Sequence, residues 1–423
     1  MNRRARIVQK SAAVIIRPTV GAEGTQHEST RSEFLVAALI GALGLPAAAA
    51  ARRRPHRPPL PSATWRRLPR WRGFNLTEKG DVTWGGAGLP YKRWDFDFIA
   101  RHGFNFVRLP LDYRLWTPSA DGSVRQLRDI DHAVALGGAR NIHVNLAFFN
   151  VPGRVASGPP EPDGIDLWAD DAGGDEARRR FAGQWQMLAE RYRGIPSTRL
   201  SFNLLNEPSG SIFRLDRRGQ HRAYLRALSP AVTAIRAVDP RRVLIADALP
   251  SWAMVKGSPR PVEGNTNPVR ELYRLRVAQS FHCYLPTMLT HYRAPWIKGS
   301  GKWPVPTWPY TNTSREVRED WVLPGPWNRD RIRRMLGVWR DVKAARVGVH
   351  AGEFGCYNQT PHGVTLAWMR DVLSVFRGLG VGWALWNLRG PFGVADSHRS
   401  DARYRWDGGH AVDTRMLALL EAW

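Results

Sequence analysis

The sequence predicts an α/β fold, a (β/α)8 TIM barrel that forms a single domain over residues 71–423. Two observations lead to this prediction. Short apolar runs alternate with segments in which apolar residues recur every three or four positions, and alternating strands and helices build a parallel sheet. The apolar runs number eight, which is the number of strands that closes such a barrel.

The expected strands follow one another along the chain with room for a helix after most of them. They cover residues 72–76, 104–109, 143–148, 200–205, 243–246, 277–282, 347–353 and 382–386. Helical periodicity is clear in 181–192, 332–339 and 368–379, where Trp and Leu residues share one face. The fifth unit is the least regular, because 251–275 is rich in Pro and Gly. The segment 287–327 is long for a loop, and long loops in compact domains usually serve function.

The N-terminal residues 1–51 have the pattern of an export signal. Arg residues precede an apolar run at 34–45, and Pro46 and a series of Ala residues follow it. The run is short for a membrane span, so we expect no stable membrane insertion after cleavage. The stretch 29–35 is similar to a twin-arginine signal, with Ser32 in place of the second Arg. These features predict a secreted or periplasmic protein, and the alternative is a buried N-terminal helix.

Residues 52–70 are expected to be a Pro/Arg-rich linker without periodicity. They contain the densest Arg cluster of a chain that has 62 Lys and Arg against 37 Asp and Glu, a formal charge of +25. The other Arg residues are scattered, and a scattered charge is more typical of an Arg-rich composition than of a nucleic-acid interface. We therefore expect no nucleic-acid partner, although an anionic partner is the alternative that this charge leaves open. We also expect a monomer.

Cofactors and metals are not expected. The 12 His residues show no HExxH or paired-ligand spacing, and no Gly-rich phosphate loop precedes a helix. Cys283 and Cys356 stand in no CxxC pattern. We expect them to be thiols, with one disulfide as the alternative.

Two predicted strands are apolar until they end in glutamate. Glu207 follows LSFNLLN and Glu353 follows VGVHAG. A carboxylate there is costly to bury unless it is paired or functional. In a (β/α)8 barrel the carboxyl ends of the strands carry the active site. Hydrolysis of a glycosidic bond requires two carboxyl groups that flank it. One protonates the leaving oxygen, and the other attacks the anomeric carbon or activates water.

The chain from 71 onward resembles glycoside hydrolase family 5, the cellulase-like family in a retaining clan of barrels. The strings that carry the resemblance are RGFN, DFIARHGFNFVRLP, LSFNLLNEP, HCY, GEFG and GWALWNLRG. The resemblance implies that Glu207 is the general acid/base and Glu353 the nucleophile. It also implies that Asn206 binds the 2-hydroxyl of the sugar.

The resemblance assigns supporting roles to four further residues. Arg108 would keep the nucleophile ionised, since a nearby guanidinium lowers a carboxyl pKa, and an ion pair with Asp112 is the alternative. Tyr284 would hydrogen-bond the nucleophile. His282 would contact the acid/base, or be a residue of the outer shell. Trp386 would be the platform under the cleaved sugar, or a core residue.

One position departs from the family pattern. The third strand ends in NLAFFNVPG, so Phe149 stands where the family carries a His. A Phe cannot donate to a sugar hydroxyl, and it makes that corner of the cleavage subsite apolar. Trp residues in the loops are candidate sugar platforms, though loop packing is the commoner role: Trp116, Trp252, Trp303, Trp308, Trp321 and Trp327.

These observations predict a cofactor-free glycoside hydrolase that acts on a β-linked polysaccharide or oligosaccharide, with β-glucan (endoglucanase- or cellulase-like) as the first choice. A β-mannan- or β-1,3-glucan-acting enzyme on the same fold is an alternative. A carbohydrate-binding protein with impaired catalysis is another, and Phe149 is the residue that motivates it.

Overall fold

The computed structural model describes residues 59–117, 123–155, 163–249, 267–312 and 325–423. The chain divides into two compact units, 1–56 and 57–423, and all described residues belong to the second. The predicted signal segment and Trp252 and Trp321 lie outside the described residues.

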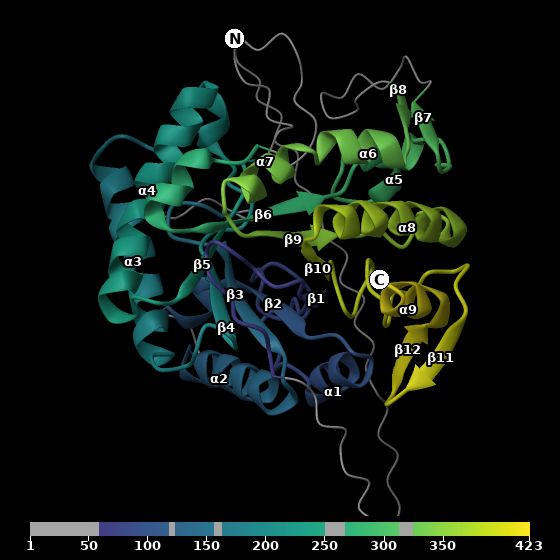
Figure 1. Cartoon of the computed structure of the whole chain (residues 1–423), viewed down its shortest axis with the longest axis horizontal. Coiled ribbons are helices and arrows are strands. Elements are labelled where there is room, and N and C mark those ends of the chain that lie inside the picture. Colours follow the sequence, from purple (N-terminus) through teal and green to yellow (C-terminus); the bar gives the residue numbers. More distant parts are fainter. Residues whose placement is uncertain (1–58, 118–122, 156–162, 250–266, 313–324) are drawn as a thin grey trace, which may run out of the picture. The chain divides into compact units, whose positions relative to one another are not determined.

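The barrel prediction is confirmed. All eight expected strands form, every neighbouring pair is parallel, and the sheet closes on itself through β1 and β2 (Figure 1). The strands are β1 (Arg72–Asn75), β2 (Phe106–Asp112), β3 (His143–Asn150), β4 (Leu200–Asn203), β5 (Val243–Asp247), β6 (Ala278–Cys283), β9 (Val349–Phe354) and β10 (Gly382–Leu385).

Helices run between the strands on the outside of the barrel (Figure 1). They are α1 (Arg93–Arg101), α2 (Ser123–Arg140), α3 (Ala172–Arg191), α4 (Arg217–Val238), α6 (Arg329–Met335), α7 (Val338–Ala344), α8 (His362–Leu379) and, after the last strand, α9 (Thr414–Glu421). The single face predicted over 332–339 is divided between α6 and α7, with Gly337 between them. In the irregular fifth unit, the described residues hold the 3-10 helix Arg270–Leu275.

The long connection from β6 to β9 has short elements of its own. These are α5 (Thr287–Thr290), the 3-10 helix Ser300–Lys302 and the antiparallel pair β7 (Tyr310–Asn312) and β8 (Gly325–Trp327). A second hairpin, β11 (Tyr404–Asp407) and β12 (His410–Asp413), follows β10. The loop tryptophans Trp116, Trp303 and Trp327 are buried, so packing accounts for them.

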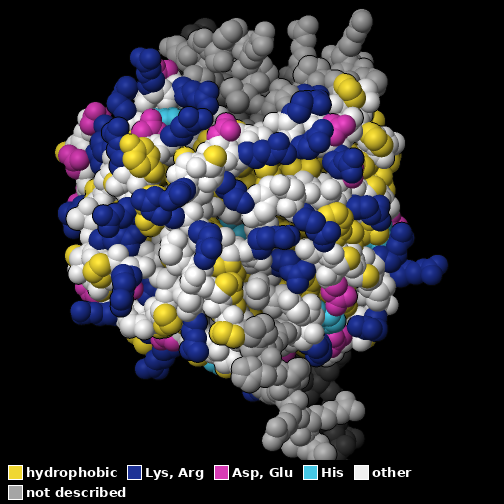
Figure 2. Space-filling model, in the orientation of Figure 1, with side chains coloured by type: hydrophobic (Ala, Val, Ile, Leu, Met, Phe, Trp, Pro, Cys, Tyr) yellow, Lys and Arg dark blue, Asp and Glu magenta, His cyan; other side chains and the backbone are white. Residues whose placement is uncertain are grey.

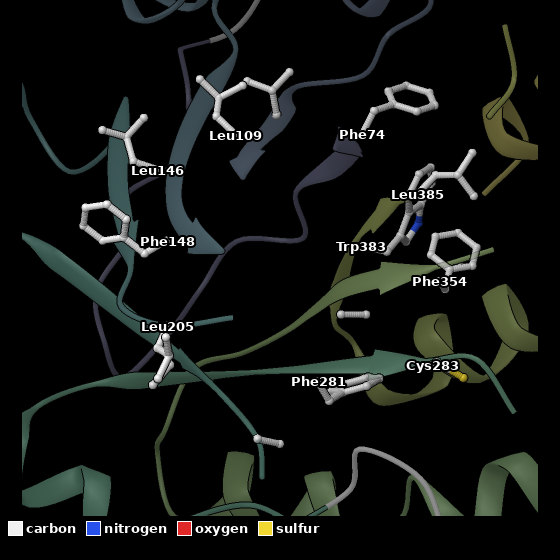
Figure 3. Close-up of a cluster of buried hydrophobic side chains, with 14 of the residues drawn as sticks. Phe74, Leu109, Leu146, Phe148, Leu205, Phe281, Cys283, Phe354, Trp383 and Leu385 are labelled. Carbon is white, nitrogen blue, oxygen red and sulfur yellow. The ribbon is translucent and has the colours of Figure 1, made fainter. Parts of the chain in front are cut away.

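Side chains alternate along each strand between the barrel interior and the layer of helices, because a strand has a period of two. Phe74, Phe281 and Phe354 belong to the large apolar cluster between strands and helices (Figure 3). Their neighbours Asn75, His282 and Glu353 are polar and buried. The outward apolar residues thus hold the strands in place, and the inward positions are left for polar groups.

The end of the barrel at which the strands begin is closed by residues 63–71. Ala63, Leu68 and Trp71 form a second apolar cluster with residues from the strand starts, among them Phe106 and Ala278. The amide of Gly348 donates to the carbonyl of Trp65 over 2.8 Å. The described part of the expected linker, 59–70, therefore includes a segment packed on the barrel, and the folded unit begins ahead of Trp71.

Charge and cysteine chemistry agree with the expectations from composition. Lys and Arg side chains are spread over the face shown in Figure 2 and do not gather in one stripe. Cys283 and Cys356 are both buried free thiols. Among the described residues there is no helix with the length and apolarity that a bilayer span requires.

Candidate active site

The carboxyl ends of the strands bring the predicted site residues together. Arg108 lies on β2, Phe149 on β3, His282 on β6 and Glu353 on β9. Tyr284 and Trp386 directly follow β6 and β10, and Asn206 and Glu207 lie in the loop after β4. All eight thus come from one end of the barrel, as the sequence predicts.

Glu207 and Glu353 face each other across this end of the barrel. A carboxylate oxygen of each lies within 4.8 Å of the other and of a ring nitrogen of His282. Carboxyl groups of retaining glycosidases are about 5–5.5 Å apart, whereas inverting enzymes need about 6.5–9.5 Å to fit a water. The close approach of the two oxygens favours the retaining arrangement over the wider inverting one.

Glu353 is held by two donors. Arg108 Nη1 donates to Oε1 over 2.7 Å, and the Tyr284 hydroxyl donates to Oε2 over 2.9 Å. Both contacts are those that the resemblance implies. The alternative pairing of Arg108 with Asp112 is not observed, because Asp112 pairs with Arg114.

Arg108 also orders its neighbours. Nη1 donates to Asn75 Oδ1 over 3.0 Å, and Nη2 donates to Asn206 Oδ1 over 2.8 Å. Since these bonds engage the amide oxygen of Asn206, its amide nitrogen is the group turned to other partners. The Asn206 side chain is therefore oriented to donate a hydrogen bond, which suits recognition of a sugar hydroxyl.

The backbone at Glu207 is unusual. Its φ is +31°, a region that non-glycine residues rarely occupy and that often marks functional sites. The strained conformation is held from both sides: the Glu207 amide donates to Asp247 Oδ2 over 3.2 Å, and Arg154 Nη2 donates to the Glu207 carbonyl over 2.5 Å. The side chain is thereby fixed toward His282, whose Nδ1 lies 2.7 Å from Glu207 Oε1.

Asp247 is a member of the site that the sequence analysis missed. Its Oδ2 lies 3.1 Å from His282 Nε2, and its Oδ1 accepts from Asn203 over 2.8 Å. Asp247 ends β5 after the buried run VLIA, so it has the same signal that identifies Glu207 and Glu353. The predicted strand stopped one residue short of it. Asn75, at the end of β1, was also missed, because the predicted strand ran one residue past it.

His282 is the electrostatic centre of the site. Although burial opposes protonation, the carboxylates of Glu353 and Asp247 raise the pKa of His282 to about 10. The imidazole is thus a cation that bridges Asp247 to the facing glutamates.

The two glutamates respond differently to this environment. Burial raises the pKa of Glu353, against the opposing charges of His282 and Arg108. Arg108 acts in the expected direction and lowers this pKa, but burial has the larger effect, so the net shift is upward. The pKa of Glu207 is lowered, since the hydrogen bond and charge of His282 overcome its desolvation.

A metal ion would have to use these same three groups. Among the described residues, the cluster of Glu207, His282 and Glu353 is the one whose donor atoms are close enough to bind an ion. A protonated imidazole has no lone pair to offer to a metal. The cluster is therefore suited to an ion-pair network between acidic groups.

Phe149 and Trp386 form one wall of the site together with Trp84. The Phe149 and Trp386 rings are nearly parallel with centroids 6.0 Å apart, and the edge of Trp84 meets both, at 4.9 and 5.8 Å. All three rings remain partly exposed. Trp84 was not predicted as a site residue, because it stands in the loop 76–92, outside any predicted strand end.

A closed (β/α)8 barrel with two carboxyl groups across its C-terminal mouth defines a glycoside hydrolase of the carboxylate-pair type. The model of the family described as Cellulase (glycosyl hydrolase family 5) matches residues 63–390, and the chain belongs to that family.

Relatives of known name agree with this membership. Endoglucanase C of Acetivibrio thermocellus is 24% identical over 326 residues, which cover 70% of this chain and 83% of that protein. Cellodextrinase A of Ruminococcus flavefaciens is 27% identical over 208 residues, 48% of this chain and 54% of that protein.

Among solved structures, a glycoside hydrolase is 33% identical with a TM-score of 0.67, covering 84% of this chain and 99% of that one. A Cel5A of Thermotoga maritima, in a complex with mannotriose, has a TM-score of 0.60 at 21% identity and covers 84% and 98%. The latter likeness concerns the fold.

Proposed function

We propose that the protein hydrolyses a β-1,4-linked glucan by double displacement with retention of configuration. The observation that carries this proposal is the short separation of Glu207 and Glu353. Family membership supports hydrolysis of a glycosidic bond, and the endoglucanase and cellodextrinase relatives support a β-glucan.

In this mechanism Glu353 attacks the anomeric carbon and Glu207 protonates the leaving oxygen. The result is a glycosyl ester on Glu353. Glu207, now ionised, takes a proton from water, which attacks the ester and releases the sugar. Arg108 and Tyr284 hold Glu353 at its two oxygens, so the attacking carboxylate is oriented before substrate arrives.

His282 stabilises the ionised form of Glu207 between the two steps. When Glu207 has given up its proton, the cationic imidazole 2.7 Å away stabilises the new carboxylate. Asp247, on the other ring nitrogen, keeps the imidazole in that orientation. Asn206, oriented by Arg108, donates to the 2-hydroxyl of the sugar on Trp386, which is the role expected from the resemblance.

The first test is release of reducing sugar from β-1,4-glucan, mannan, β-1,3-glucan and xylan. We expect β-1,4-glucan to be the best substrate, and Glu353→Gln to reduce turnover by about 10³-fold or more because the nucleophile is lost. The matched control is Glu190→Gln, which changes an exposed glutamate on α3 and should leave the rate unchanged. Wild-type rates in Glu353→Gln would refute the assignment of the nucleophile.

Two further measurements decide the mechanism. The product first released should have the β configuration by proton NMR, and an activated 2-fluoro glycoside should leave an ester on Glu353 that peptide mass spectrometry detects. An α product would contradict retention. Oligosaccharide binding without turnover of any polymer would favour the binding protein over the enzyme.

Mannan is the second candidate substrate. A fold neighbour was crystallised with mannotriose and, in another structure, with cellobiose, and Phe149 alters the subsite on which the choice between sugars depends. A higher kcat/KM on mannan than on β-1,4-glucan would select this candidate.

We also propose that the protein is exported, on the strength of the apolar run at 34–45 and the small residues after it. Cell fractionation tests the proposal. The full chain should be found outside the cytoplasm in a processed form, and a variant without residues 1–51 should be retained.

A further inference from the structure

Three aromatic rings form an apolar wall at the end of the barrel that carries the two glutamates. Trp84, Phe149 and Trp386 lie with their ring centroids within 6.0 Å of one another. Since Trp386 is the proposed platform for the cleaved sugar, a ring bound there has Phe149 beside it.

The polar side chains next to Phe149 are already engaged within the protein. Asn150 donates its amide hydrogens to Asp81 over 2.9 Å and to Asp112 over 2.8 Å. Arg154 donates to the carbonyls of Phe149 and Glu207 and to the hydroxyl of Ser209. Neither side chain is turned toward a sugar on Trp386.

The same contacts fix Trp84 against Phe149. Asp81 Oδ1 accepts from the amide and the hydroxyl of Thr83, over 2.8 and 2.7 Å, while its Oδ2 accepts from Asn150. Asn150 thereby ties the loop that carries Trp84 to the end of β3. The aromatic wall is consequently held in place by both the loop that carries Trp84 and the end of β3, and it does not depend on Phe149 alone.

A hydroxyl placed against this wall would lose its hydrogen bonds to water and gain none from the side chains described above. Leaving a polar group unpaired in this way disfavours binding by a factor of about 5 to 150. A sugar inside a 1,4-linked chain has free hydroxyls at positions 2, 3 and 6. Position 2 is the one assigned to Asn206, which leaves positions 3 and 6 as the two candidates to meet the wall.

We propose that the cleavage subsite selects a β-glycoside whose sugar has no free hydroxyl toward Phe149, so that a deoxy position or an apolar substituent meets the aromatic wall. This inference rests on the proposed hydrolysis of a β-linked sugar at this site. Unmodified β-1,4-glucan is then cleaved less efficiently than a chain that carries such a sugar at the cleavage subsite.

The test compares three 4-nitrophenyl β-cellobiosides, in which the sugar next to nitrophenol is unmodified, 3-deoxy or 6-deoxy. We expect kcat/KM of the wild type to be higher for one deoxy compound than for the parent, by about fivefold or more. Phe149→His supplies a donor and should bring this ratio below one. Phe149→Leu is the matched control, since it stays apolar and should keep the deoxy preference.

A parent compound preferred over both deoxy compounds by the wild type would overturn the inference, and so would an equal ratio in wild type and Phe149→His. The wild-type ratio decides the matter even where Phe149→His fails to fold. If no compound is cleaved, the proposed function fails separately, and calorimetric affinities for the same three compounds then decide. Tighter binding of a deoxy compound supports the apolar subsite, and tighter binding of the parent contradicts it.

Discussion

His282 lies between the two glutamates, and its positive charge lowers the pKa of each of them. The proposed mechanism needs one proton on the pair of glutamates. The acid limb of the pH–rate profile therefore reports loss of the first proton from the pair, and the basic limb reports loss of the second. One imidazole therefore influences both limits of the pH range in which the enzyme works.

Replacing His282 with Asn should move both limbs of the kcat/KM profile to higher pH. Without the cation, both glutamates hold their protons to a higher pH, so both apparent pKa values of the pair rise. The measurement is kcat/KM against pH for both proteins. His132→Asn, at an exposed position on α2, is the control, and a profile of unchanged position in His282→Asn would contradict the arrangement.

At the residue scale the sequence identifies the two glutamates and their direct partners, because strand-end polar residues after apolar runs are a local signal. The direction of their pKa shifts was not accessible in this way. The shift of Glu353 depends on how completely the folded chain removes water from it, and the role of Asp247 depends on its distance from His282. Both are properties of tertiary packing.

At the scale of elements, the eight strands are predictable since each combines an apolar outer face with a short length. The segment 63–71 is not, because Pro and Arg dominate its surroundings and its few apolar residues do not follow the period of a strand. Its structure comes from the open end of the barrel, which offers Phe106, Val243 and Ala278 as an apolar surface to be covered.

Leu68→Ala tests whether this covering segment contributes to stability. Leu68 is 8% exposed and belongs to the second apolar cluster, at the end of the barrel where the strands begin. Removing its side chain should lower the free energy of unfolding by about 2–3 kcal/mol. Denaturant-induced unfolding measures the change. Leu89→Ala, at a side chain that is 55% exposed, is the matched control with an expected effect within about 0.5 kcal/mol. Equal effects of the two substitutions would show that 63–71 is only loosely attached.

For the molecule as a whole, the histidines in the barrel interior near Trp71 are expected to lower the stability of the fold in acid. His143 stacks on Trp71, with 3.8 Å between ring centroids, and Phe106 lies close to both His143 and His350. Burial lowers the pKa of each of these histidines to about 3. Both are therefore neutral in the folded protein at pH values where an unfolded chain takes up protons.

Stability should accordingly fall as the pH drops from about 6.5 toward 3. In that window the unfolded state binds more protons than the folded state, so each histidine contributes a loss of up to about 1.4 kcal/mol per pH unit. Thermal or urea unfolding between pH 7 and 4 measures the slope. His143→Gln should make the slope shallower, whereas His398→Gln, at an exposed position, should not. A slope that stays the same in His143→Gln would refute this origin of acid sensitivity.

The segment 63–71, which closes the end of the barrel where the strands begin, also determines where the chain can be tethered. Residues 63–71 contact the starts of the strands, whereas Glu353 lies near the end of β9 and Glu207 follows β4, at the opposite end of the barrel. An attachment made just ahead of this segment, whether to a solid support, a carrier protein or a cell surface, would start from the face opposite the mouth of the cleft. A polymer too large to enter the barrel could then still approach the carboxylates while the enzyme stays fixed in place.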